Sequence, residues 1–204
     1  MAGIILLAAG LGSRFIAAGG EGNKLNATLS KTAENAASVF DITLGHALES
    51  GLPVHVVTRA GNLQVQASCR RAGVPFTLTE STGTGGSIAA GVRDTPEWDG
   101  WLVHLADMPF VTPDIFATVA DTLHLKPVVR PFWQNEPGHP VGFAREMGDK
   151  LLQLRGDHDA RELIRSHDLL RIDFNTSGVI ADIDLPGDLA LSPRLLNGNL
   201  HAAS

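Results

Sequence analysis

Residues 3–15 read GIILLAAGLGSRF, an apolar run that passes directly into small residues, two glycines and an arginine. The apolar part is typical of a buried β-strand. Gly10 and Gly12 allow the backbone after it to bend closely around a ligand, because no Cβ stands in the way. Backbone N–H groups and the cation of Arg14 would then face an anion. This stretch therefore predicts a phosphate site after the first strand of an α/β fold.

Two common phosphate-binding motifs do not match this stretch. A Walker loop requires a lysine directly after its last glycine, whereas Gly12 is followed by Ser13. A dinucleotide fingerprint requires a third glycine where this chain has Phe15, so only two of the three positions fit. An ordinary glycine-rich turn between a strand and a helix stays open as the simpler interpretation.

Length and composition exclude several classes of protein. The chain has 204 residues, which suits one α/β domain with a substantial core. Its net charge of −6 lacks the basic field of nucleic-acid-binding proteins. The single cysteine, Cys69, excludes a disulfide framework and a cysteine-based zinc site. The N-terminal apolar run is too short to span a membrane and lacks the charged start of a signal peptide, so we expect a cytoplasmic protein.

Strand-like and helix-like segments alternate along the chain. The expected strands are Ile4–Ala8, Val54–Thr58, Phe76–Thr79, Trp101–Ala106, Lys126–Phe132, Gly138–Phe143, Leu170–Phe174 and Val179–Ile183. The expected helices are Val39–Ser50, Asn62–Ala72, Gly86–Val92, Pro113–Leu123, Arg145–Leu154 and Asp159–His167. This alternation predicts a Rossmann-like, three-layer α/β fold with a mostly parallel sheet and helices on both faces.

The domain organisation follows from the same pattern. We expect a single domain over residues 1–192, because no low-complexity linker divides it. The glycine- and alanine-rich segment Ala17–Asn23 indicates a mobile loop, and residues 193–204 are expected to form a poorly ordered tail.

Acidic residues follow two of the expected strands. Asp107 comes directly after the strand Trp101–Ala106, at the edge of a parallel sheet where ligands bind. A carboxylate there, together with phosphate oxygens, suits Mg²⁺. Asp182 and Asp184 end the run Val179–Ile183, and on an extended chain their spacing places both carboxylates on one side, where a divalent cation would relieve their repulsion. A turn cap and a solvated strand end are the simpler alternatives.

Other candidates are weaker when each is taken alone. Lys24, beyond the expected loop, could meet a phosphate or simply be solvated. The segment Gly83–Val92, GTGGSIAAGV, is typical of a glycine-rich helix start that could hold a ribose, a base edge or a phosphate, although close packing on the sheet explains it equally well. Ser87 does not fit a hydrolase elbow, because Ala89 occupies the position of the last glycine.

Two further motifs lie later in the chain. His139 stands between Gly138 and Pro140 at the start of an expected strand, where it could contact a ligand or be structural. Asp157 or Asp159 is expected to cap the helix that follows the sequence LRGD.

In this order, the motifs resemble those of the molybdenum cofactor nucleotidyltransferases, in the superfamily that also contains the sugar-nucleotide pyrophosphorylases. The shared pattern is LAAGxxxR…K, GxxxSxxxGV, DMP, GHPVxF, LxGDxxAR and DIDxPxDL, and it spans nearly the whole chain. The pattern is most similar to the cytidylyltransferase branch of that family. This branch transfers CMP from CTP to the phosphate of molybdopterin and releases pyrophosphate.

The resemblance implies a role for each matching residue. It implies that Arg14 and Lys24 bind the β- and γ-phosphates, that Asp107 holds Mg²⁺ with Asp182 and Asp184 completing the metal site, and that His139 lines the acceptor pocket. The remaining nucleotide-binding residues that it implies are Ala8, Ala9, Gly10, Gly12, Ser13, Gly86 and Ser87.

The nucleotide base and the partners also follow from the resemblance. The sister enzymes that use GTP typically read LAGG where this chain reads Leu7-Ala8-Ala9-Gly10, which favours CTP. The implied partners are CTP or another NTP, a phosphorylated acceptor such as molybdopterin, and a transient contact with a molybdoenzyme or its maturation factor. A guanylyltransferase, a transferase with another acceptor and a non-catalytic nucleotide-binding module are the alternatives.

Overall fold

The stretch that opens the chain forms a central strand of the sheet. The computed structural model describes residues 1–29, 36–81 and 83–190. In it, β1 (Gly3–Ala8) lies between β2 (Val54–Thr58) and β4 (Gly100–Leu105), and it is parallel to both. All six residues of β1 are buried, because helices cover both faces of the sheet at this strand.

The described residues form an eight-stranded sheet in the order β3-β2-β1-β4-β7-β5-β6, with β8 paired to β5. The other strands are β3 (Phe76–Leu78), β5 (Val128–Trp133), β6 (Glu136–Pro137), β7 (Val141–Ala144) and β8 (Leu169–Asp173). Strand β7 runs antiparallel to β4 and β5, and β6 runs antiparallel to β5, whereas all other pairs are parallel. The prediction of a mostly parallel sheet is confirmed.

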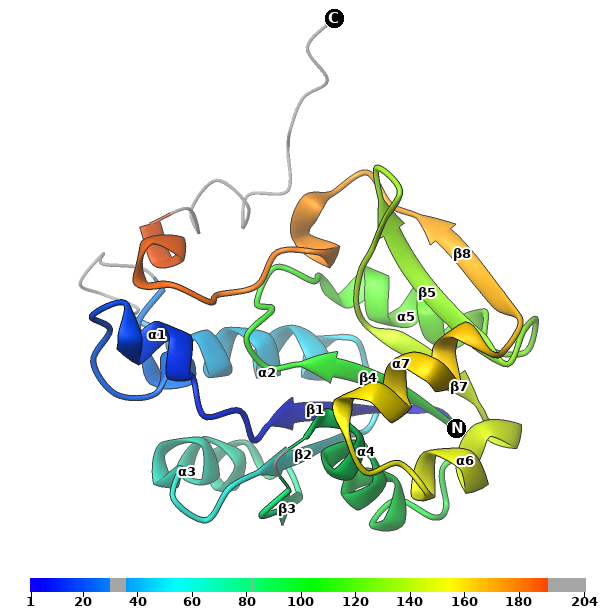
Figure 1. Ribbon diagram of the computed structural model, residues 1–204, viewed down its shortest axis with the longest axis horizontal. Helices are drawn as coiled ribbons and strands as arrows, with labels where there is room; N and C mark the ends of the chain where they lie inside the picture. The colour runs from blue at the N-terminus through cyan, green and yellow to red at the C-terminus, as the bar shows by residue number, and fades with distance from the viewer. Residues whose placement is uncertain (30–35, 82, 191–204) are drawn as a thin grey trace, which may run out of the picture.

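Alternate side chains of β1 enter two separate cores. Ile4 and Leu6 pack in a core with α2 (Val39–Glu49), α3 (Leu63–Ala72) and α5 (Pro113–Asp121). Ile5 and Leu7 pack in the other core with α4 (Thr84–Arg93), α6 (Gly148–Leu152) and α7 (Asp157–Arg165). The predicted three-layer arrangement is thus confirmed, and Figure 1 shows α4, α6 and α7 in front of the sheet with α2 and α5 behind it.

The carboxyl ends of β1 and β4 carry the short elements that matter most for the site. Helix α1 (Ser13–Ala17) and the 3₁₀ turn η1 (Lys24–Asn26) follow β1. The chain after β8 crosses back to the same edge through η3 (Ser177–Val179) and η4 (Pro186–Ala190), and Figure 1 shows this orange segment beside α1. Residues more than 150 positions apart therefore meet at one end of the sheet.

Three sequence-based assignments are wrong in detail. The run Val179–Ile183 is not a strand, because only isolated hydrogen bonds, such as the one from the Ile183 amide to the Asp107 carbonyl, connect it to its neighbours. Its Val179 and Ile183 are apolar because they are buried in the core. The expected strand Gly138–Phe143 is wrong in its first half, because β7 begins only at Val141, after the cis His139–Pro140 bond. The expected helix Arg145–Leu154 divides into η2 (Arg145–Met147) and α6.

Three further comparisons concern the helix α1, the predicted tail and the membrane. The five-residue helix α1 was not expected, and its residue Ala17 belongs to the segment predicted as a loop. The predicted tail, residues 193–204, lies outside the described residues. None of the described helices has the length and apolar character that crossing a membrane requires.

His104 on β4 should make the stability of the fold sensitive to acid. It is fully buried, its Nε2 lies 3.0 Å from the Met108 carbonyl, and its ring meets the Phe116 ring edge-on. Burial lowers its pKa from 6.5 to about 4. As the pH falls below 6.5, the unfolded chain therefore binds a proton that the folded chain does not, and the free energy of unfolding decreases.

We expect His104→Leu to reduce the loss of stability between pH 7 and pH 4 by on the order of 2 kcal/mol. Chemical denaturation of the variant and the wild type across this pH range measures the difference. His124→Gln, at an exposed histidine, is the control and should follow the wild type. An unchanged pH dependence in His104→Leu would contradict this account of the buried imidazole.

Candidate active site

A cavity of about 440 Å³ lies at the carboxyl ends of β1, β2 and β4, and its size suits a small-molecule ligand. Ten of the predicted site residues line it. They are Ala8, Ala9, Gly10, Gly12, Ser13, Arg14, Lys24, Ser87, Asp107 and Asp184. Most of these residues follow β1 or β4, in agreement with the rule that ligands bind beyond the carboxyl ends of parallel strands.

The loop between β1 and α1 forms one wall of this cavity. Gly12 has φ +65°, a left-handed conformation that glycine adopts without strain, and it precedes the first residue of α1. Phe15 is buried and fixes α1 on the core, whereas the side chain of the neighbouring Arg14 is 81% exposed. The Thr58 hydroxyl donates a hydrogen bond of 3.1 Å to the Ala8 carbonyl, which anchors the start of the loop.

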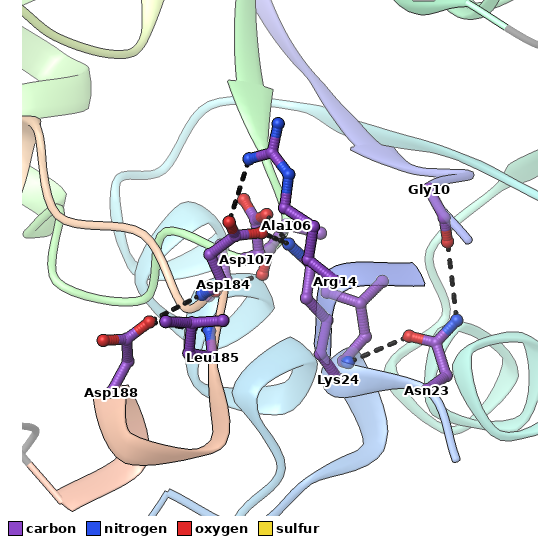
Figure 2. A network of polar contacts seen from close by, with 11 residues as sticks. Gly10, Arg14, Asn23, Lys24, Ala106, Asp107, Asp184, Leu185 and Asp188 are labelled. Atoms are coloured by element: carbon purple, nitrogen blue, oxygen red, sulfur yellow. Dashed lines mark hydrogen bonds and ion pairs between the residues drawn. The ribbon is translucent and has the colours of Figure 1, made fainter. Parts of the chain in front are cut away.

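Lys24 reaches the cavity despite the long segment that separates it from Arg14. The Asn23 side chain accepts a hydrogen bond of 2.9 Å from the Leu25 amide, and Leu25 is buried, so η1 holds a fixed position. The Lys24 Nζ then lies 2.6 Å from Asp107 Oδ2 and 3.4 Å from Asp184 Oδ1 (Figure 2). Burial lowers the pKa of Lys24, but the attraction of the two carboxylates outweighs it, and the net pKa is raised.

Asp184 joins both cations of the site. Its Oδ2 accepts a hydrogen bond of 2.9 Å from Arg14 Nη1, so Arg14 and Lys24 share one carboxylate, as Figure 2 shows. The hydrogen bond from Arg14 and the proximity of Lys24 lower the pKa of Asp184. The carboxylate of Asp188 accepts hydrogen bonds from the amides of Asp184 and Leu185, at 2.9 and 2.8 Å, and thereby fixes this segment.

Asp107 lines the cavity and has a buried carboxylate oxygen that lacks a hydrogen-bond partner among the described residues. Its Oδ2 pairs with Lys24, whereas its Oδ1 is buried without a hydrogen-bond partner among the described residues. Such an oxygen is costly to leave unpaired, and a divalent cation would satisfy it. The backbone carbonyl of Asp107 accepts the Ile183 amide at 2.8 Å, which draws the segment of Asp182 and Asp184 to the end of β4.

The three predicted metal ligands are not gathered into a complete site. Among the described residues, no group of three or more histidine, cysteine, aspartate or glutamate side chains is arranged to hold a metal ion. Asp182 does not line the cavity, and burial together with the charge of Asp107 raises its pKa. These carboxylates fit a cation that takes most of its ligands from water and phosphate, as Mg²⁺ does.

The start of α4 forms the opposite wall, and it is already capped by another segment. The Thr84 amide donates to Asp157 Oδ1 at 2.5 Å, and the Gly86 amide donates to the Arg155 carbonyl at 2.9 Å. Gly86 does not line the cavity, and a Cβ at this position would collide with the Ser81 hydroxyl, so its glycine serves close packing. The prediction of Asp157 or Asp159 as the N-cap of α7 is wrong, because Gly156 is the N-cap. The Asp159 carboxylate, within the first turn, accepts the Arg155 and Gly156 amides.

Ser87 and His139 differ in their relation to the cavity. Ser87 lines it, and its hydroxyl donates to the Gly83 carbonyl at 3.3 Å. His139 does not line it. The structure instead places the half-buried His139 near His104 and Arg130, where desolvation first and these two neighbours second lower its pKa to about 3. The expected contact of His139 with an acceptor therefore has no support from this cavity.

Sequence reasoning missed four polar residues that line the cavity: Arg59, Ser81, Thr84 and Asp157. Arg59 follows β2 directly, so the same strand-end rule could have found it. Thr84 lies within Gly83–Val92, a segment that the sequence offered only as a whole. Ser81 and Asp157 reach the cavity through contacts at the start of α4, which no local pattern indicates.

Residues 4–171 match the family described as MobA-like NTP transferase domain. The comparison with curated proteins gives no match. Among solved structures, the chain is similar to Rv0371c from Mycobacterium tuberculosis H37Rv, at 21% identity and a TM-score of 0.78, over 96% of this chain and 97% of that one. A second crystal structure of Rv0371c is a complex with manganese.

Two other solved structures share the fold. The nucleotidyl transferase Mth528 from Methanothermobacter has 20% identity and a TM-score of 0.80, over 98% of this chain and 99% of that one. The molybdopterin-guanine dinucleotide biosynthesis protein A from Archaeoglobus fulgidus has 17% identity and a TM-score of 0.70, over 98% of this chain and 100% of that one.

The contact between Asp157 and Thr84 predicts a measurable contribution to stability. Asp157→Ala removes the acceptor of the Thr84 amide, and we expect it to lower the free energy of unfolding by about 1 kcal/mol, the usual cost of losing a helix cap. Urea denaturation measures the change. Glu162→Ala, at an exposed position within α7, is the control and should stay within about 0.5 kcal/mol of the wild type. Equal stability of both variants would contradict the capping role.

Proposed function

The chain belongs to the MobA-like NTP transferase domain family, and on that premise we propose that it transfers CMP from CTP to the phosphate of molybdopterin. The reaction releases pyrophosphate and depends on Mg²⁺. The observation that carries this proposal is the convergence of Arg14, Lys24 and Asp107 in one cavity at the carboxyl ends of β1 and β4. The arrangement supplies two cations for a triphosphate and a carboxylate for a metal ion.

The two cations would bind the phosphates in different ways. Arg14 is exposed at the mouth of the cavity, and its planar guanidinium suits two oxygens of the departing pyrophosphate. Lys24 lies deeper and would act as a point charge. Both are paired with Asp184 in this structure, so a bound triphosphate would replace one carboxylate as their common counter-ion.

Asp107 would hold Mg²⁺ through its unpaired Oδ1, with phosphate oxygens and water as further ligands and with Asp182 and Asp184 nearby. When bound, the ion supplies positive charge to the phosphates that transfer and depart. The manganese complex of Rv0371c supports a divalent ion in a protein of this fold.

In the proposed reaction the protein positions the two substrates and stabilises negative charge. An oxygen of the acceptor phosphate attacks the α-phosphorus of CTP, a new O–P bond forms, and the bond to pyrophosphate breaks. The acceptor phosphate is already ionised at neutral pH, so the step requires no general base. The role of Arg14 and Lys24 is to stabilise the negative charge that builds on the leaving group, which preorganised cations do effectively.

The choice of CTP rests on Ala9, which lines the cavity where the related guanylyltransferases carry a glycine. Molybdopterin as the acceptor rests on the motif pattern and on the similarity to the Archaeoglobus fulgidus protein, whose name specifies a guanine dinucleotide. A product of this kind would pass to a molybdoenzyme or its maturation factor through a transient contact.

Removal of the charge of Asp107 tests the catalytic part of the proposal. We expect Asp107→Asn to lower the rate of pyrophosphate release at least about 100-fold, because charge stabilisation of this kind is typically worth that much. Coupled detection of pyrophosphate with CTP, Mg²⁺ and molybdopterin measures it, and circular dichroism checks the fold. Asp149→Asn, at an exposed residue of α6, is the control. A rate near that of the wild type in Asp107→Asn would contradict the proposed role of Asp107 in holding the metal ion.

The base is tested by the thermal stability of the protein with each of the four NTPs and Mg²⁺. A ligand that binds only the folded state at 100 times its Kd adds about 2.7 kcal/mol of stability. We expect the largest increase in Tm with CTP. A larger increase with GTP would overturn the base assignment while leaving the transferase family untouched.

A further inference from the structure

We infer that Arg59 is a positioning residue that fixes the two loops between which the nucleoside of the NTP lies. This inference rests on the proposed function, and it adds a residue that neither the motifs nor the family resemblance indicated. Arg59 lies directly after β2, lines the cavity, and contacts the loop after β1 and the segment after β3 at the same time.

One guanidinium bridges two carbonyls from distant parts of the chain. The Arg59 Nε donates to the Ala9 carbonyl at 2.6 Å, and its Nη2 donates to the Ser81 carbonyl at 2.6 Å. These acceptors lie 50 and 22 residues from Arg59 in sequence. Because the guanidinium is planar and rigid, the two bonds fix the carbonyls relative to each other, which a lysine could not do.

The backbone of Arg59 is itself held in place. The Thr58 hydroxyl bonds to the Ala8 carbonyl, and the Gln66 side chain, which is buried in α3, donates to the Arg59 carbonyl at 3.1 Å. The guanidinium therefore projects from a rigid base. A rigid base is what a residue needs if it is to fix two loops.

Ser81 transmits this arrangement to the start of α4. Its hydroxyl donates to the Gly83 carbonyl at 2.9 Å and accepts from the Gly83 amide at 3.3 Å. Gly83 is followed by Thr84 and Ser87, both of which line the cavity. Arg59 thus determines the distance between Ala9 on one wall and the start of α4 on the other, which are the parts of the site assigned to the nucleoside.

The charge of Arg59 also distinguishes it from the other two cations of the cavity. Arg14 and Lys24 pair with carboxylates, whereas Arg59 forms no ion pair within the described part of the chain. It is partly buried, and both of its guanidinium hydrogen bonds go to backbone carbonyls. None of the hydrogen bonds of its guanidinium reaches Arg14, Lys24, Asp107 or Asp184. The bridge that Arg59 forms between the Ala9 and Ser81 carbonyls (the Arg59 clamp) is therefore separate from the phosphate end of the cavity, formed by Arg14, Lys24, Asp107 and Asp184.

This separation makes the role of Arg59 testable by comparing two ligands. Pyrophosphate would use only the phosphate end, whereas an NTP would use both ends. We expect Arg59→Ala to weaken CTP binding at least about 10-fold and to leave pyrophosphate binding within about twofold, both measured by calorimetry with Mg²⁺. In turnover, KM for CTP should rise while kcat stays within about threefold of the wild type. Arg59→Lys should recover part of the CTP affinity, since it retains the charge and its N–H donors but lacks the planar, rigid guanidinium that fixes both carbonyls.

The control is Arg93→Ala, because Arg93 is an exposed arginine at the end of α4 and should leave both affinities unchanged. An equal loss of CTP and pyrophosphate affinity in Arg59→Ala, or unchanged CTP affinity, would refute the positioning role. If Arg59→Ala does not fold, Arg59→Lys decides by the same comparison. A wild-type protein that binds neither pyrophosphate nor any of the four NTPs would instead refute the proposed function itself.

Discussion

The ion pair between Lys24 and Asp107 is the contact on which the site depends. Both side chains are mostly buried, at 12% and 18% exposure, and their 2.6 Å contact joins the segment after β1 to the end of β4. Loss of Lys24 would leave Asp107 without an ion pair among the described residues, and loss of Asp107 would leave Lys24 only its longer contact with Asp184. Breaking a buried pair in this way typically costs several kcal/mol. The cation that would meet a triphosphate is therefore held in place before any nucleotide binds. Such preorganisation is what charge-stabilised phosphoryl chemistry requires.

A common local device positions the charged residues around this pair. Arg14 precedes the buried Phe15, Lys24 precedes the buried Leu25, and Asp184 follows the buried Ile183. In each case an apolar neighbour is buried in the core, and the charged residue beside it lines the cavity. Figure 2 shows the three charged side chains converging. The hydrophobic effect thus supplies the energy that brings like and unlike charges together from three distant segments. Asp184 pairs with both cations and so offsets their mutual repulsion.

The sequence was most informative where local pattern and tertiary position agree. The buried strands β1 and β4 are apolar runs, and the residues at their carboxyl ends, from Ala8 to Arg14 and at Asp107, line the cavity. The run Val179–Ile183 was wrongly predicted as a strand, because an irregular segment buried in the core has the same apolar residues as a strand of a sheet. The sequence could not separate the two roles open to Gly86, since a glycine needed for packing looks like a glycine needed for a ligand, and in the structure Gly86 packs against Ser81. The clamp of Arg59 rests on carbonyls 50 and 22 residues away, and no single-sequence pattern shows such contacts.

The central claim is that a nucleotide and a divalent ion meet between Asp107, Lys24 and Arg14. Its most direct test is a crystal structure with CTP and Mn²⁺, in which anomalous scattering locates the ion. We predict an anomalous peak within coordination distance of Asp107 Oδ1 and triphosphate density beside Arg14 and Lys24. The cytidine should lie between Ala9 and the start of α4. An ion bound elsewhere, or a nucleotide outside this cavity while Lys24 stays paired with Asp107 and Asp184, would contradict it.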